Sequence, residues 1–308
     1  MRPTVRIASR TSGWSVADAS AAGTSATLTA FDRDTAVRLL SRSDGGAGGA
    51  AQFAADVSGR WRAGRGPHGG YLAAIMLRAL VEAVADPLRA PRSLTIHYAR
   101  APQPGPVSID ATIERQGRSL STLSARMEQD GALVALALAA FSVAWDAPEI
   151  AELPMPDVAG QDRERKPGIP LFEGAPPFTS HLIIQPRIGA VPFQGSDAPM
   201  EIGSWLGLAE ARAIDALSLA FFSDALFSPP FIRLTEPSTT PTLDLTIHFR
   251  TPMPRSAEPD PEELCFARFR SGLIHEGFFE EDGVIWASDG SVLAQSRQLG
   301  IVLPRPIG

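Results

Sequence analysis

The sequence contains one cysteine and one lysine among its 308 residues, and the scarcity of thiols limits its chemistry. The single thiol of Cys265 excludes a disulfide within the chain and the thiolate pair of a structural zinc site. Cys265 lies in the apolar run 264–269, where a cysteine is usually a small buried hydrophobe. We therefore expect no metal, no nucleophilic cysteine and a reducing compartment, the cytoplasm.

Long apolar runs and an excess of positive charge are also missing. No stretch of about 18 apolar residues is present, and the N-terminus lacks the continuous apolar core of a signal peptide. With 28 basic against 34 acidic residues, the net charge is −6. We therefore expect no membrane span, no nucleic-acid partner and no binding to an anionic membrane, while a small polar substrate is left open.

Length and composition indicate a globular protein of two domains, because 308 residues exceed one average domain and 44% of them are hydrophobic. Residues 1–26 are rich in Ser, Thr, Ala and Arg without periodicity, which predicts a disordered leader. A stretch dense in Pro and Gly, residues 146–180, is expected to link an N-terminal domain, 27–145, to a C-terminal domain, 181–308.

The first half predicts one apolar helix followed by antiparallel strands. Residues 72–80 are mostly apolar, contain no Gly or Pro, and follow the glycine pair Gly69-Gly70. A helix this apolar must be buried, and a sheet wrapped around it is the natural partner. Alternating strands follow, and Asp130-Gly131 is a strong hairpin signal.

The second half repeats the first. The strand Leu94–Tyr98 returns as Leu245–Phe249 at an offset of 151, and Asp130-Gly131 returns as Asp289-Gly290. The helix at 70–80 has its counterpart in the apolar segment 214–227. Such self-similarity predicts two copies of one domain, packed as a pseudo-dimer about a twofold axis.

Polar residues appear in the second copy where the first copy is apolar. Asp224 lies among Phe and Leu residues in the second predicted helix, and its counterpart falls near Ala74. Gln298 falls opposite Ala139, and Thr242 opposite Pro91. A carboxylate on an apolar helix needs a partner or a catalytic task, so the second copy is the candidate for chemistry.

Each of these residues also has a purely structural interpretation. Asp224 could be an exposed residue near a helix end, since Ser228-Pro229-Pro230 stops the helix soon afterwards. Gln298 could lie on the solvent face of a strand. Strict alternation puts Thr242 on the face opposite Leu245, which leaves its direction open unless the start of the strand is irregular.

Together, these features resemble the bacterial type II acyl-CoA thioesterases with two hot-dog domains, over residues 31–303. In the first half the matching segments are the glycine turn 66–70, the arginine-glycine turn 115–119 and the Asp-Gly hairpin. In the second half they are the segments around Asp224, Thr242 and Gln298. The resemblance implies an α+β double hot-dog fold, with two tandem antiparallel sheets each wrapped around a long helix.

The resemblance also implies a mechanism and a substrate. Asp224 would be the general base for a water that attacks the thioester of acyl-CoA, and Thr242 and Gln298 would hold that water. A backbone N–H at a helix start would stabilise the oxyanion, and no cofactor would be needed. The turn His68, Gly69 and Gly70 would bind substrate from the facing domain.

The sequence also suggests a phosphate-binding residue and leaves two alternative functions open. We expect Arg118 near the cleft mouth, where it would bind the phosphates of CoA. His68 could instead catalyse a dehydratase or hydratase reaction on an acyl thioester, or the protein could bind acyl-CoA or an acyl carrier without catalysis. Association into a homo-oligomer is also left open.

Overall fold

The computed structural model describes residues 28–43, 47–64, 66–164, 166 and 176–304. The predicted leader, 1–26, and part of the predicted linker lie outside these residues. The elements of the first half are α1 (Ala30–Asp34), β1 (Val37–Arg42), β2 (Ala50–Val57), the 3-10 helix η1 (Gly59–Trp61), β3 (Arg62–Ala63), β4 (Gly66–Pro67), α2 (Gly69–Val84), β5 (Ala90–Tyr98), β6 (Gly105–Gln116), β7 (Leu120–Gln129) and β8 (Ala132–Ser142). Those of the second half are η2 (Pro177–His181), β9 (Leu182–Ile188), β10 (Glu201–Leu208), α3 (Ala216–Phe222), η3 (Pro229–Ile232), β11 (Ser238–Thr239), β12 (Thr242–Phe249), β13 (Cys265–Arg270), β14 (Ile274–His275), β15 (Phe278–Trp286), β16 (Val292–Ile301) and β17 (Leu303–Pro304).

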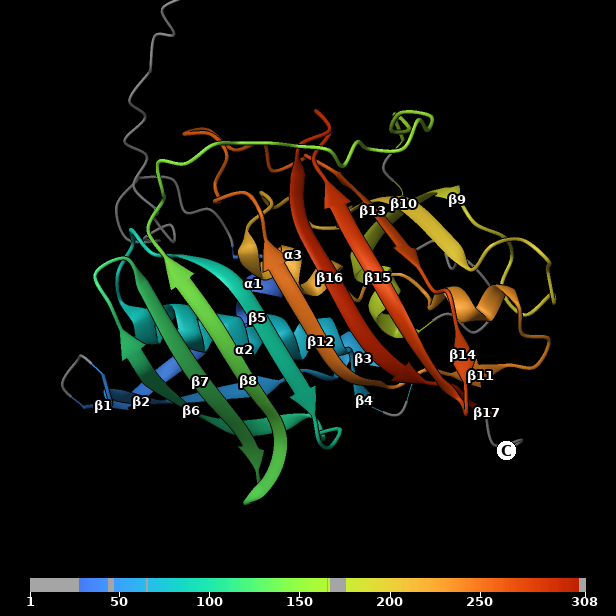
Figure 1. The fold of residues 1–308 in the computed structure, drawn as a ribbon. Coiled ribbons are helices and arrows are strands. Elements are labelled where there is room, and N and C mark those ends of the chain that lie inside the picture. The colour runs from blue at the N-terminus through green and yellow to red at the C-terminus, as the bar shows by residue number, and fades with distance from the viewer. Residues whose placement is uncertain (1–27, 44–46, 65, 165, 167–175, 305–308) are drawn as a thin grey trace, which may run out of the picture.

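Both halves contribute to one continuous antiparallel sheet, which has 13 strands in the described residues. The order is β1-β2-β6-β7-β8-β5-β12-β16-β15-β13-β10-β9, with β14 paired to β15 beside this path. The strands of the second half repeat those of the first in mirror order. The two halves of the sheet therefore join through β5 and β12, which lie side by side at the centre of Figure 1.

The register of that central pair agrees with the sequence repeat. Thr95 pairs with Thr246, the residue 151 positions later, and their hydroxyl oxygens are 3.1 Å apart. The flanking pairs are symmetric about this point, because Leu94 pairs with Ile247 and Ile96 with Leu245. This is the register that a twofold axis through the threonine pair requires.

The predicted apolar helix is α2, which packs against strands β2, β5, β6, β7 and β8 and against α3. Figure 1 shows α2 along one face of the sheet of the first half. The helix of the second half is shorter than predicted: α3 covers Ala216–Phe222 and not 214–227. One apolar core extends from α2 and its strands to α3 and the inner face of the second half. No helix in the described part of the chain is long and apolar enough to cross a membrane.

Part of the predicted linker packs as a strap, residues 150–162, on the outer face of the second half. Its side chains Leu153, Met155 and Val158 pack on an apolar cluster that contains Trp205 and Trp286. The indole N–H of Trp286 donates to the Leu153 carbonyl, and that of Trp205 donates to the Ala159 carbonyl, both at 3.1 Å. In Figure 1 the chain after β8 crosses above the sheet towards β9.

Candidate active site

Asp224 lies in a turn just after α3, which corrects the expectation of a mid-helix position. The helix ends at Phe222, with Ser223 as the C-cap, and the amide of Asp224 donates to the Phe221 carbonyl. The helix cannot continue far, because prolines follow at 229 and 230. The side chain is nevertheless only 14% exposed, so the exposed-residue interpretation is also wrong.

The carboxylate of Asp224 lies at the N-terminus of α2 in the other half of the molecule. Its Oδ2 accepts a hydrogen bond from the Gly70 N–H at 2.9 Å. Free N–H groups and the helix dipole make this the end of a helix that binds anions. The junction of the two halves therefore holds a carboxylate in a fixed position.

His68 is the N-cap of α2 and supports the turn that carries Asp224. Its Nδ1 accepts the Tyr71 N–H at 3.3 Å, so the proton is on Nε2, which lies 2.6 Å from the Asp224 carbonyl oxygen and 3.5 Å from Oδ2. Burial lowers the pKa of His68, against an opposing effect of the Asp224 charge. Both ring nitrogens are engaged, which disfavours His68 as the acid or base of a hydratase.

The glycines that follow His68 leave room for the Asp224 turn. A Cβ on Gly69 would lie 2.7 Å from Asp224 Oδ2, and a Cβ on Gly70 would lie 2.5 Å from the Phe221 carbonyl oxygen. The Tyr98 hydroxyl donates to the Gly69 carbonyl at 2.8 Å. Burial, and then the charge of Asp224, raise the pKa of Tyr98 well above 10.0. At Gly70, where the close atom belongs to the backbone, only glycine allows the two halves to approach this closely.

Thr242 and Gln298 meet on the inner face of the sheet, on β12 and β16. The Thr242 hydroxyl donates to Gln298 Oε1 at 2.9 Å. A β-bulge between Thr242 and Asp244 inserts Leu243 and turns Thr242 to the face of Leu245. The first half has a bulge at the equivalent place, between Pro91 and Ser93. The irregular strand start thus gives Thr242 its direction.

Glu281, which was not expected from the sequence, lies on β15 directly across from Gln298. Gln298 Nε2 donates to Glu281 Oε1 at 2.7 Å, and both side chains belong to residues only 5% exposed. Burial, and then the charge of Asp224, raise the pKa of Glu281 well above 4.5. In the first half, Leu123 pairs with Ala139 as Glu281 pairs with Gln298, so extending the repeat to β15 would have found it.

Two polar groups therefore lie near each other: Asp224 at the start of α2, and the chain from Thr242 through Gln298 to Glu281. In the described residues no hydrogen bond joins Asp224 directly to Thr242 or Gln298. Tyr98 reaches Gly69 from the end of β5, where β5 lies beside the start of β12. The charge of Asp224 also contributes to the raised pKa of Glu281.

Arg118 is not brought to this site, contrary to the expectation of a place at the cleft mouth. It lies in the turn after β6, where its carbonyl and that of Gly117 accept hydrogen bonds from Arg89, just beyond the C-terminal end of α2. A helix of 16 residues is about 24 Å long, and the Asp224 site is at its other end.

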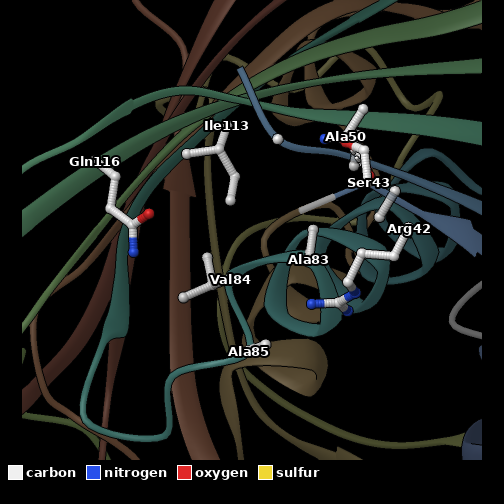
Figure 2. Close-up of a pocket in the computed structure, with 11 residues that line it drawn as sticks. Arg42, Ser43, Ala50, Ala83, Val84, Ala85, Ile113 and Gln116 are labelled. Atoms are coloured by element: carbon white, nitrogen blue, oxygen red, sulfur yellow. Dashed lines mark hydrogen bonds between the residues drawn. The ribbon is translucent and has the colours of Figure 1, made fainter. Parts of the chain in front are cut away.

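A hollow of about 170 Å³ also lies at the C-terminal end of α2 and is shown in Figure 2. Ala83 and Ile113 are among its mostly apolar lining residues, and Arg42, Ser43 and Gln116 supply polar groups. Among the described residues, the lining includes no His, Cys, Asp or Glu that could act as a general base. The hollow is therefore not the candidate active site.

We expect the stability of Glu281→Gln relative to wild type to depend on pH. The folded protein keeps the Glu281 proton to higher pH than the unfolded chain, so the free energy of unfolding falls as pH rises above about 4.5. Because glutamine does not ionise, the free energy of unfolding of the variant should not fall with pH in this way. Thermal denaturation should give similar melting temperatures at pH 4 and a higher one for the variant at pH 8. Glu280→Gln, on the other face of β15, is the control, and an equal difference at both pH values would contradict the prediction.

Comparison with protein families gives two matches that together cover most of the chain. A model of the acyl-CoA thioesterase N-terminal domain matches residues 57–142, and a model of the acyl-CoA thioesterase C-terminal domain matches residues 151–302. A search of curated protein sequences finds no significant match.

Solved structures similar to this one include three bacterial proteins. A conserved protein of unknown function with a hot-dog fold from Alicyclobacillus acidocaldarius is 24% identical, with a TM-score of 0.74, over 91% of this chain and 100% of that chain. A putative thioesterase II from Thermobifida fusca is 22% identical, with a TM-score of 0.72, over 90% and 98%. The acyl-CoA thioesterase II TesB2 from Mycobacterium marinum is 18% identical, with a TM-score of 0.64, over 91% and 99%. The predicted hot-dog fold is thereby confirmed, although α3, with 7 residues, is not the long helix that was expected in the second half.

Proposed function

Because this chain belongs to the acyl-CoA thioesterases, a family of thioester hydrolases, we propose that it cleaves acyl-CoA with a water molecule activated by Asp224. The observation that supports this most strongly is the fixed carboxylate at the junction of the halves, 2.9 Å from the Gly70 N–H. A base must be held near the water whose proton it takes, and this contact holds it.

In the proposed reaction, the water lies between Asp224 and the Thr242–Gln298 pair. Asp224 takes one proton while the water oxygen attacks the thioester carbonyl carbon. The C–S bond then breaks, CoA leaves as the thiolate, and the proton held by Asp224 passes to the thiolate or to solvent. No covalent nucleophile on the protein is needed.

The developing oxyanion would be stabilised by the start of α2. The Gly70 N–H is bound to Asp224 and the Tyr71 N–H to His68. The N–H of Gly69 is therefore the proposed donor at the helix start, with the Gln298 amide as a second donor. His68 and the two glycines would act by shaping this turn.

Release of free thiol from a panel of acyl-CoA esters tests the function. Hydrolysis that follows saturation kinetics is expected for at least one acyl chain. Saturable binding without thiol release would instead favour a non-catalytic binding protein, and hydration of an enoyl thioester would favour a hydratase. We propose cytoplasmic lipid metabolism as the setting, because acyl-CoA is the proposed substrate and a single cysteine leaves the chain without an internal disulfide.

Gln298→Ala is expected to lower kcat by about 10², because removing one positioned donor to the developing oxyanion has an effect of this size. Thr242→Ala should lower kcat less, because a water molecule can replace a hydroxyl group. Steady-state kinetics on the best acyl-CoA would check this order. Ser296→Ala, two residues before Gln298 on β16, is a control and should keep wild-type kcat. A greater loss in Thr242→Ala than in Gln298→Ala would contradict the roles given to them.

A further inference from the structure

We propose that Glu281 is a positioning residue of this site, which acts through Gln298 by fixing the direction of its amide group. The inference rests on the proposed function and adds a residue of the second half to it. Glu281 would not touch the reacting atoms. It would instead determine that the amide oxygen of Gln298 accepts from Thr242, so that the amide nitrogen is the end that donates.

The geometry of the hydrogen bonds carries this inference. The two ends of a glutamine amide are nearly equal in size, so packing alone does not set its direction. Thr242 donates to Oε1 at 2.9 Å, and Nε2 donates to Glu281 at 2.7 Å. With one N–H on Glu281, the second N–H of Nε2 is held in a fixed direction. That N–H is the one available to the water or to the thioester carbonyl oxygen.

The fold itself does not require a carboxyl group at this place. The equivalent residue of the first half is Leu123, fully buried across from Ala139. A buried carboxyl group is unfavourable without a partner, and in the described residues Glu281 has no ion pair with any cation. Glu281 and Gln298 are thus a polar pair at a position where the same architecture accepts an apolar one.

The surroundings of Glu281 favour its neutral, protonated form, which can still accept a hydrogen bond. The acidic groups that act on it are Asp224 and Asp282, and Gln298 is its hydrogen-bond donor. Burial and the Asp224 charge keep the Glu281 proton bound at pH values where an exposed glutamate is ionised. A neutral carboxyl group still accepts the Gln298 N–H through its carbonyl oxygen, and it does not compete with Asp224 for the proton of the water.

The test compares Glu281→Leu and Glu281→Gln in the full-length protein, with Glu280→Gln as the matched control. Leucine is the residue found at the equivalent place of the first half, and it removes the acceptor. We expect kcat to fall about tenfold in Glu281→Leu, the size of one lost neutral hydrogen bond, with KM within about twofold. Glu281→Gln keeps an acceptor oxygen, so its kcat should stay within about threefold of wild type.

The pH profile separates positioning from mere packing. In wild type, ionisation of Glu281 as the pH rises adds a negative charge near the oxyanion and lowers kcat, and Glu281→Gln should lack that decline. Wild-type kcat and an unchanged pH profile in Glu281→Leu would overturn the inference. The inference would also be overturned if Glu281→Leu and Glu281→Gln lost kcat equally and in step with their losses of melting temperature.

A second measurement keeps this inference separate from the proposed function. If wild type releases no thiol from any acyl-CoA, the proposed function fails, and the Gln298 amide is then observed directly by NMR. Its Nε2–H₂ signal is assigned by its loss in Gln298→Ala. Exchange with water should be about tenfold slower in wild type than in Glu281→Leu, because the protecting hydrogen bond is absent there. Equal exchange rates would overturn the positioning role.

Discussion

Asp224→Asn is expected to lower kcat by about 10² to 10⁴, because a positioned general base contributes this much and an amide cannot take the proton of the water. KM should change little, since the substitution keeps the size of the side chain. Free-thiol release under saturating acyl-CoA measures the effect. Asp244→Asn, on β12 but on the outer side of the sheet, is the matched control and should keep wild-type kcat.

The stability of Asp224→Asn should change by about 1 kcal/mol or less. The amide oxygen can still accept the Gly70 N–H, and what is lost is the interaction of a full charge with the start of α2. A folded protein with little activity is therefore expected. Full thioesterase activity in this variant would exclude Asp224 as the base.

Gly69→Ala is expected to lower kcat by about 10² to 10³ while leaving the protein folded. The new methyl group would lie 2.7 Å from Oδ2 of Asp224, which is the mobile end of a side chain and can move away. A base displaced by about 1 Å loses about 10² in rate or more. Kinetics and thermal denaturation of the same preparation check both parts of this prediction.

Gly70→Ala is the comparison for that variant and should behave in the opposite way. Its methyl group would lie 2.5 Å from the backbone carbonyl oxygen of Phe221, which cannot move without shifting α3. We expect a loss of stability of about 2 kcal/mol or more, or failure to fold. If Gly69→Ala proved the less stable of the two, the explanation by these contacts would be wrong.

The sequence repeat predicted more of the fold than any single motif. The offset of 151 between matching strands is the offset between Thr95 and Thr246, the central pair of the sheet. The alignment of Gln298 with Ala139 holds in the structure. Gln298 pairs with Leu245, and Ala139 pairs with Leu94, which is the counterpart of Leu245 at the offset of 151. Alternation and turn signals repeat along a chain, so two copies can be compared without any knowledge of their packing.

Other features depended on contacts between distant residues. Alternation alone gave no direction for Thr242, because a bulge in the strand turns the side chain. The end of α3 before Asp224 and the position of Arg118 at the far end of α2 depend on how the helices pack. Glu281 was not expected because residues 280–282 are all acidic, and such a run is typical of a solvent-exposed segment.

The junction of β5 and β12 has a consequence for synthesis of the chain. When Thr95 has left the ribosome, its strand partner Thr246 is still 151 residues away. At translation rates of about 5 to 20 residues per second, β5 stays an unpaired edge for about 8 to 30 s. Open strand edges recruit other chains, so the nascent first half is prone to aggregate during this interval.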